Sequence, residues 1–197
     1  MLIGILAFQG DFVEHKKMLD CLNVESVYVK RPEQLQKIDG IIIPGGESFV
    51  IEKLAKNFGV FDILSKKISD GMPVYGTCAG MIMLSKNILD GNYGQSGLNV
   101  MNISVRRNAF GRQVDSYEED LSVKNFDAPF RGIFIRAPWV ENAQDSVEIL
   151  ARSYSKTNLG NIVAVREKNM LATSFHPESG KDTRFHKLFL QICNEYK

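Results

Sequence analysis

Cysteine is scarce in this chain of 197 residues, and the few cysteines present do not form a framework. The three of them, Cys21, Cys78 and Cys193, are an odd number and lie far apart. Such a set argues against a disulfide-stapled fold and fits a reducing compartment. No cysteine pair has the short spacing of a zinc site, and no histidine is placed to complete one. The cysteines are therefore candidates for chemistry or for the core.

An excess of charge and a long apolar run are also absent. Lys and Arg number 24 against 23 Asp and Glu, which leaves a formal net charge of +1. Nothing in this balance calls for a nucleic acid or an anionic membrane as partner. The basic cluster Arg106, Arg107 and Arg112 is interrupted by Asn108 and Gly111, so a solvated or substrate-facing strand end explains it better.

The first eight residues are apolar, but they lack a basic start and are too few for a signal peptide or a membrane helix. They are typical of a buried first strand. We therefore expect a cytoplasmic protein that binds neither nucleic acid nor membrane.

Strand-length apolar runs alternate with helical patterns in the first half of the chain. The continuous run Ile38–Ile43 is typical of a strand buried on both faces of a parallel sheet. The other strand candidates are Leu2–Phe8, Val24–Val29 and Val74–Tyr75, and helical patterns run through residues 12–22, 51–58 and 81–84. This order predicts an α/β layer fold with a largely parallel sheet and right-handed crossovers.

The second half of the chain differs in that short strand-like runs follow a polar loop. Residues 89–99 are rich in Gly, Asn and Ser and indicate a loop, without the Lys-Ser/Thr of a phosphate-binding loop. Short strand-like runs follow at Val100–Arg106, Val114–Val123, Gly132–Ile135, Val147–Ala151, Ile162–Val165 and Met170–Phe175. Apolar residues from Phe185 to Tyr196 have helical spacing, with Asp182 as the expected N-cap. Cys193 and Cys21 are expected in the core, and the length fits one domain over residues 1–197.

The segment around Cys78 has the pattern of a nucleophile elbow. The strand Val74–Tyr75 leads into Gly76-Thr77-Cys78-Ala79-Gly80, and an apolar helical pattern follows at once. Glycines on both sides permit a sharp turn that exposes the middle side chain. A thiol at a helix N-terminus is also favoured as the reactive thiolate. The alternative is a small buried cysteine in a glycine-rich turn.

A second segment supplies the base that a thiol nucleophile needs. His176-Pro177-Glu178 follows the predicted strand Met170–Phe175, so His176 could move protons while Glu178 orients it. In an α/β sheet the carboxyl ends of the strands share one edge, which also brings Gly45-Gly46 to the site. The backbone N–H groups of Gly46 and Ala79 would then form an oxyanion hole. A Cys, His and Glu set implies acyl transfer through a thioester with water as acceptor, but leaves the acyl group open.

These motifs together resemble those of a known family. The elbow, with His176-Pro177-Glu178 downstream, is similar to class I (triad) glutamine amidotransferase domains, and within them to the glutaminase subunits of pyridoxal 5′-phosphate synthases. The matching stretches run nearly from end to end: Gly4–Asp11 with Glu14-His15, Val29–Pro32, Pro44–Ser48, Gly76–Gly80, Arg107–Ser116, Phe134–Pro138 and Ser174–Glu178. The elbow and His-Pro-Glu identify only the class, whereas the stretches around Arg107 and Arg136 are specific to the subfamily.

The resemblance implies a flavodoxin-like, three-layer α/β/α fold and hydrolysis of L-glutamine to L-glutamate and ammonia. Cys78, His176 and Glu178 would be the triad, without metal or cofactor. The residues implied around bound glutamine are Gly46, Glu47, Ser48, Arg107, Ile135 and Arg136. Arginine suits the α-carboxylate and Glu47 the α-ammonium group. The alternative to substrate binding is that the two arginines form ordinary surface ion pairs. For Glu47 the alternative is an acidic residue in the first turn of a helix, where the helix dipole favours it.

The resemblance also implies a partner, the (β/α)₈-barrel subunit of a pyridoxal 5′-phosphate synthase, which would receive ammonia through an internal tunnel in a hetero-oligomer. Three rival functions remain open from the sequence. The chain could serve another ammonia-using synthase, such as imidazole glycerol phosphate synthase. It could be a docking subunit without turnover, or a cysteine peptidase on a similar scaffold.

Overall fold

A ten-stranded sheet organises the computed structural model, which describes residues 1–107, 116–155 and 160–196. Its first half is parallel, in the order β2-β1-β3-β4-β12. These strands are β1 (Leu2–Leu6), β2 (Glu25–Val29), β3 (Gly40–Ile43), β4 (Val74–Thr77) and β12 (Met170–Thr173). Strands β3, β4 and β12 are buried at every residue, which explains why they are apolar except for Thr77 and Thr173 at the ends of β4 and β12.

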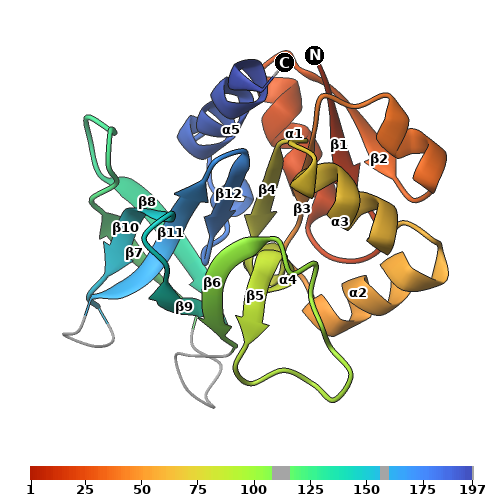
Figure 1. The fold of residues 1–197 in the computed structure, drawn as a ribbon. Helices are drawn as coiled ribbons and strands as arrows, with labels where there is room; N and C mark the ends of the chain where they lie inside the picture. The colour runs from red at the N-terminus through yellow and green to blue at the C-terminus, as the bar shows by residue number, and fades with distance from the viewer. Residues whose placement is uncertain (108–115, 156–159, 197) are drawn as a thin grey trace.

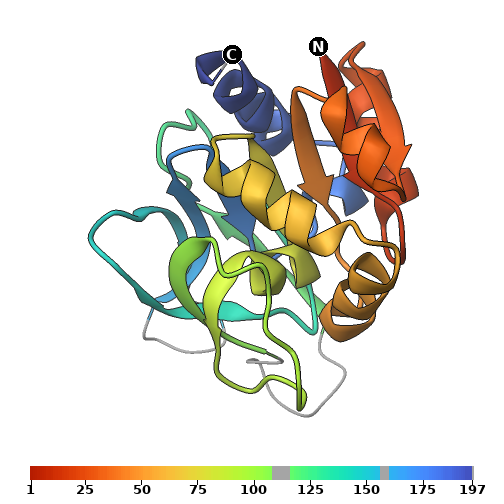
Figure 2. The same ribbon diagram turned by 45° about the vertical axis from the view of Figure 1, so that its right-hand side comes forward.

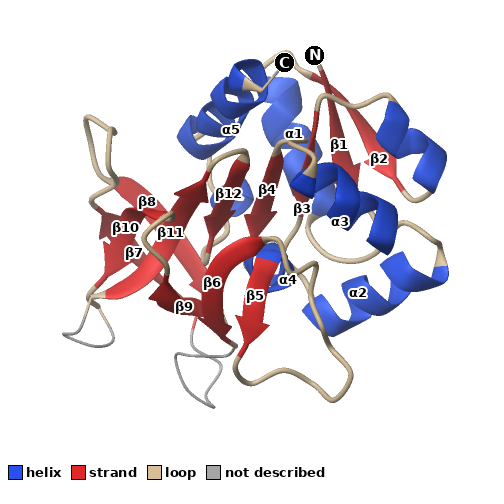
Figure 3. Cartoon of the chain, in the orientation of Figure 1, coloured by secondary structure: helices blue, strands red, loops and turns tan. Residues whose placement is uncertain are grey.

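The sheet continues past β12 as a mainly antiparallel half, in the order β11-β9-β6-β5, with β10 paired to β11 (Figure 1). These strands are β5 (Ser85–Ile88), β6 (Met101–Arg106), β9 (Trp139–Ala143), β10 (Glu148–Ser153) and β11 (Asn161–Glu167). The hairpin of β7 (Ser116–Leu121) and β8 (Phe130–Ile135) forms a separate two-stranded sheet. Figure 3 shows that the helices gather against the parallel half.

Helices cover both faces of the parallel half and create two apolar cores. The helices are α1 (Phe12–Cys21), α2 (Ser48–Asn57), α3 (Phe61–Ser69), α4 (Ala79–Leu84) and α5 (Arg184–Glu195). One core joins the sheet to α2, α3 and α4. The other joins it to α1, α5 and the β7–β8 hairpin. Figures 1 and 2 place α3 and α5 on opposite sides of the sheet. The predicted three-layer α/β/α architecture is therefore confirmed, and β12 beside β4 supports the proposal of one domain.

Several local predictions are corrected. Cys21 is exposed at the end of α1, whereas Cys193 is buried as expected. The N-cap of α5 is Thr183, one residue after the expected Asp182. The Asp182 carboxylate still accepts from the first-turn N–H of Arg184 and from its guanidinium, at 3.0 Å each. The predicted strand Val114–Val123 begins outside the described residues, and β7 covers Ser116–Leu121 of it.

One α-helix and two strands have no counterpart in the prediction, namely α3, β5 and β9. Strand β5 is an edge strand whose Lys86 and Asn87 are exposed, and β9 carries the exposed pair Glu141 and Asn142. Neither has the regular apolar alternation by which a strand is recognised. Among the residues described, no helix is both long and apolar enough to cross a lipid bilayer.

Candidate active site

The carboxyl ends of the parallel strands meet at a cavity of about 430 Å³. Strand β4 leads to Cys78, β12 leads to His176, and β3 leads to the turn at Gly46. The residues that line the cavity are Gln9, Gly10, Asp11, Gly46, Glu47, Ser48, Cys78, Ile82, Arg107, Ile135, Arg136 and His176. Side chains far apart in the sequence thus face one space because their strands are neighbours in the sheet.

The backbone at Cys78 is strained. Its φ of 47° and ψ of −99° form a conformation that costs an L-residue about 1–3 kcal/mol. Its N–H donates to Thr173 O at 2.8 Å, which ties the elbow to β12. The flanking glycines allow close approach: a Cβ on Gly80 would lie 2.2 Å from Ile43 O, and one on Gly76 would lie 2.6 Å from the Gly80 carbonyl carbon. The sharp turn predicted for the glycines therefore falls on Cys78 itself.

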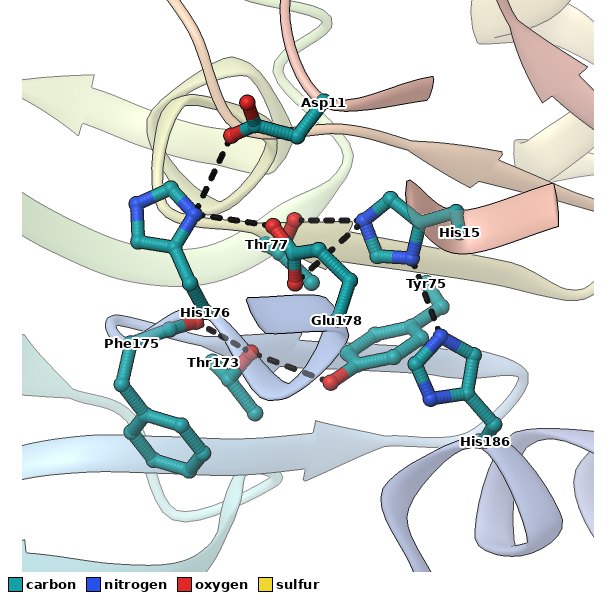
Figure 4. Close-up of polar contacts among 9 residues, drawn as sticks. All are labelled: Asp11, His15, Tyr75, Thr77, Thr173, Phe175, His176, Glu178 and His186. Atoms are coloured by element: carbon teal, nitrogen blue, oxygen red, sulfur yellow. Dashed lines mark hydrogen bonds and ion pairs between the residues drawn. The ribbon is translucent and has the colours of Figure 1, made fainter. Parts of the chain in front are cut away.

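Two carboxylates face the same nitrogen of His176 (Figure 4). Nδ1 lies 2.8 Å from Glu178 Oε1 and 3.3 Å from Asp11 Oδ2. Glu178 is buried in the 3₁₀ turn Pro177–Ser179, and the rigid proline between the two triad residues keeps it below the imidazole. Asp11, just after β1, is partly exposed and approaches from the cavity side.

These neighbours determine the charge of His176. Burial alone would lower its pKa, but hydrogen bonds with Asp11, Cys78 and Glu178 outweigh burial and raise the pKa to about 12. Burial raises the pKa of Glu178, against the lowering effect of its hydrogen bond with His176. His176 is therefore an imidazolium at neutral pH, a proton donor beside the Cys78 sulfur.

At the rim of the cavity, Glu47 and Arg107 pair with each other. Arg107 Nη2 donates to Glu47 Oε1 at 2.9 Å, and Nη1 donates to Gln95 Oε1 at 3.1 Å. Gln95 also donates to Ser48 Oγ at 2.9 Å. Glu47 is the N-cap of α2, where its other oxygen accepts from Val50 N at 2.8 Å. One carboxylate thus serves both the helix start and the cavity.

The hairpin supplies the opposite wall. Ile135 ends β8 and Arg136 follows it with a φ of 45°, and both line the cavity. The backbone of His176 donates to Ile133 O at 2.8 Å, so the hairpin is joined directly to the triad loop.

The cavity brings together nearly all of the residues that the sequence singled out. Cys78, His176 and the predicted glutamine-binding residues line it, whereas Ala79 is buried below the elbow and Glu178 lies behind His176. Residues 108–115, which belong to the stretch Arg107–Ser116 that is specific to the subfamily, lie outside the described residues.

Sequence reasoning missed Gln9, Asp11 and Ile82. Gln9 Oε1 accepts from Glu47 N at 2.7 Å, which links the ends of β1 and β3. The signal that could have found the first two is the rule used for the other strands, because they follow the carboxyl end of β1.

A strained cysteine on the strand-to-helix elbow after β4, with a His–Glu pair after the neighbouring strand β12 of the same sheet, is the arrangement of a cysteine-triad hydrolase. Residues 5–195 match the model of the SNO glutamine amidotransferase family. The chain belongs to this family, which confirms the class that the motifs predicted.

Individual relatives agree with the family match. The pyridoxal 5′-phosphate synthase subunit PdxT of Nocardioides sp. is 51% identical over 98% of this chain and 96% of its own length. The PdxT of Fervidobacterium nodosum is 48% identical over the whole of both chains. A crystal structure of a glutamine amidotransferase superposes with a TM-score of 0.90 at 44% identity, covering 98% of each chain. The structure of PurLQS from Thermotoga maritima shares the fold with a TM-score of 0.69 at 18% identity, covering 100% of this chain and 98% of that one.

Proposed function

We propose that this chain is the glutaminase subunit of a pyridoxal 5′-phosphate synthase. It hydrolyses L-glutamine to L-glutamate and ammonia and delivers the ammonia for vitamin B6 biosynthesis. The observation that carries the proposal is the strained Cys78 beside the imidazolium of His176, at the floor of a cavity of amino-acid size. Full-length similarity to PdxT subunits supports the same substrate and pathway.

In the first half-reaction, the Cys78 sulfur attacks the side-chain amide carbon of glutamine. The tetrahedral intermediate collapses when His176 gives a proton to the amide nitrogen, so that ammonia leaves and a thioester remains. In the second half, water attacks the thioester while His176 accepts its proton. The Cys78 sulfur is then released with glutamate. Glu178 holds the imidazole in the orientation that both transfers need.

The oxyanion of each tetrahedral intermediate would be bound by the N–H groups of Gly46 and Ala79. Gly46 has a φ of 148°, and a Cβ there would lie 2.5 Å from Gln9 Oε1, so only glycine fits this turn. Loss of one such donor costs about 10²–10³ in rate in a well-studied hydrolase. Ala79 is the first residue of α4, where helix geometry leaves the N–H without an intrahelical partner.

Glutamine itself would be held at the rim. The guanidinium of Arg107 or Arg136 suits its α-carboxylate, and Glu47 suits its α-ammonium group. Glu47 and Arg107 form an ion pair with each other, so binding would insert one amino acid between two opposite charges that already face each other. Ser48 and Ile135 complete the walls.

We propose that the ammonia passes to a (β/α)₈-barrel synthase subunit in a hetero-oligomer. Docking would align the Gly46 peptide and so activate the glutaminase. The test measures glutamate and ammonia release by the chain alone and with the synthase subunit. We expect a clear rise on docking, and equal rates in the two samples would contradict it.

The nucleophile is tested by Cys78→Ala in the same complex. We expect no detectable glutaminase activity, with the fold and the docking unchanged because alanine fits the site. Cys21→Ser is the matched control, since Cys21 is exposed on α1 and should leave the rate unchanged. Residual hydrolysis in Cys78→Ala would remove Cys78 from the mechanism. Partner exchange with another ammonia-using synthase, and labelling of Cys78 by a glutamine-like electrophile, separate the remaining functional alternatives.

A further inference from the structure

All three histidines of the chain lie in one buried line that starts at the triad and runs away from the cavity (Figure 4). His176 contacts Glu178 Oε1, and the other oxygen, Oε2, lies 3.5 Å from His15 Nε2. His15 Nδ1 lies 3.0 Å from His186 Nε2. His15, on α1, and His186, on α5, are completely buried. The mechanism above uses neither of them.

The protons of these two imidazoles can be placed from their contacts. Within the described residues, His186 Nδ1 is buried and has no hydrogen-bond partner. A buried N–H without an acceptor is costly, so the single proton of a neutral His186 belongs on Nε2. From there it is donated to His15 Nδ1, which must therefore be the bare nitrogen of His15. The proton of His15 is then on Nε2.

That proton points toward the back of the triad. His15 Nε2 lies 3.1 Å from Thr77 Oγ1 as well as 3.5 Å from Glu178 Oε2. Among the described residues Oε2 is buried and makes no hydrogen bond of normal geometry. A carboxylate oxygen in such a place needs a nearby positive dipole. The His15 N–H is that dipole.

We propose that His15, held in its tautomer by His186, is a positioning residue that directs its Nε2–H at Thr77 and the Oε2 side of Glu178. This contact keeps the Glu178 carboxylate turned so that Oε1 meets His176 Nδ1. Without it, Glu178 could rotate, and His176 Nδ1 would rely on the partly exposed Asp11. The role in glutamine hydrolysis rests on the proposed function, whereas the proton positions do not.

The electrostatic setting agrees with two neutral imidazoles. Burial, together with the neighbouring His186 and His176, lowers the pKa of His15 well below its usual value. Burial lowers the pKa of His186 to about 4. Each ring therefore carries one proton at neutral pH, as the directed line of donors requires.

The first experiment is long-range ¹H–¹⁵N NMR of the full chain labelled on histidine. With three histidines the spectrum is simple, and His15→Gln and His186→Gln assign it by removing one ring each. We expect His15 and His186 both to carry the proton on Nε2 with a bare Nδ1. A proton on His15 Nδ1, or a doubly protonated His15, would overturn the proposal whether or not the chain hydrolyses glutamine.

The second experiment compares His15→Gln with His15→Asn in the complex with the synthase subunit. The Gln amide can stand where Nε2–H was, whereas Asn reaches only the position of Nδ1 and keeps the contact with His186. We expect kcat to stay within about threefold in His15→Gln and to fall about 10–100-fold in His15→Asn, as when a partner that orients a metal-binding histidine is lost.

KM should not change in either variant, because His15 does not line the cavity. Equal losses in the two variants, or a loss carried by KM, would indicate a merely structural histidine and refute the proposal. If His15→Asn does not fold, the tautomers of His15 and His186 measured by NMR in the wild type decide whether the proposal holds. A wild-type complex without glutaminase activity would refute the proposed function and leave the tautomer result standing.

Discussion

At the scale of single residues, the site combines backbone strain with opposed charges. Cys78 adopts a backbone conformation that costs about 1–3 kcal/mol, and the hydrogen bond from its N–H to Thr173 O helps to hold it there. In this conformation Cys78 lines the cavity although the residue is only 7% exposed. Such strain persists only where the surrounding packing determines it, which here is the close contact of Gly80 with Ile43.

The charge of His176 leads to a prediction for Asp11→Asn. This change removes the carboxylate 3.3 Å from His176 Nδ1 and should lower the pKa of His176 from its value of about 12. A raised folded-state pKa stabilises the fold fully below the ordinary value of about 6.5, and this stabilisation disappears as pH rises through the folded-state value. Asp11→Asn should therefore be less stable than wild type near neutral pH, and the difference should shrink toward alkaline pH.

Urea unfolding across this pH range checks the prediction, and histidine NMR follows the titration of His176. The start of α1 should not confound it, because the Asp11 side chain makes no capping hydrogen bond. Asp20→Asn is the matched control: Asp20 pairs with Lys16 on the exposed face of the same helix and should have little effect. Parallel pH profiles for wild type and Asp11→Asn would contradict the assignment.

At the scale of elements, α2 anchors the loop that precedes β6. Glu52, 2% exposed, accepts hydrogen bonds from Ser96 N and Gly97 N at 3.0 Å each and from Lys56 Nζ at 2.6 Å. The adjacent Gln95 contacts Ser48 and Arg107 at the cavity rim. One buried carboxylate thus connects the helix, the loop and side chains that line the cavity.

We predict that Glu52→Gln lowers the free energy of unfolding by about 2 kcal/mol near neutral pH, because charged hydrogen bonds become neutral and one donor loses its acceptor. Burial raises the pKa of Glu52, but the hydrogen bonds from Lys56, Ser96 and Gly97 outweigh it and lower the pKa. The stabilisation is therefore present above about pH 4.5 and is lost as pH falls through the folded-state value. Urea titrations at several pH values measure this.

The same variant should raise KM for glutamine, since the loop no longer holds Gln95 against Arg107. Glu33→Gln, on an exposed turn before β3, is the control and should change neither property. A Glu52→Gln protein with lower stability and unchanged KM would show that the loop acts on the fold alone.

At the scale of the whole molecule, an aromatic cluster joins the hairpin to the main sheet. The ring centroid of Phe185, on α5, lies 4.8 Å from that of Phe130 and 5.2 Å from those of Phe175 and Phe126. Phe175 directly precedes His176. The cluster therefore holds the β7–β8 hairpin, the triad loop and α5 in one body.

We predict that Phe185→Ala lowers the free energy of unfolding by about 3–5 kcal/mol, as expected for a fully buried ring. KM should rise as well, because the hairpin carries cavity residues. Denaturant unfolding and glutaminase kinetics measure the two effects. Phe58→Ala, a change at an exposed ring stacked on Phe8, should cost less than about 1 kcal/mol. Equal costs for the two substitutions would contradict the role given to the cluster.

Some residues of the candidate site can be identified from the sequence alone and others cannot. Cys78 and His176 were found because each follows an apolar strand, and strand ends are visible in the sequence. His15 and His186 were not found as a pair, since each has the spacing of a core position on its own helix. Glu52 looks like an ordinary helix surface charge, and its burial depends on a loop more than forty positions away.

Local periodicity and motif chemistry were enough to predict the fold class and to single out Cys78 and His176 as the proposed nucleophile and base, because each of these signals depends on residues close together in the chain. Contacts between distant residues came only from the packed structure. The loop after β1, whose Asp11 N–H donates to Gly45 O, brings Asp11 to His176. The layering of α1 and α5 brings His15 to the back of Glu178. A sequence pattern records which face of an element is buried, but not what it is buried against. That choice depends on strand register and helix packing, which are properties of the whole chain.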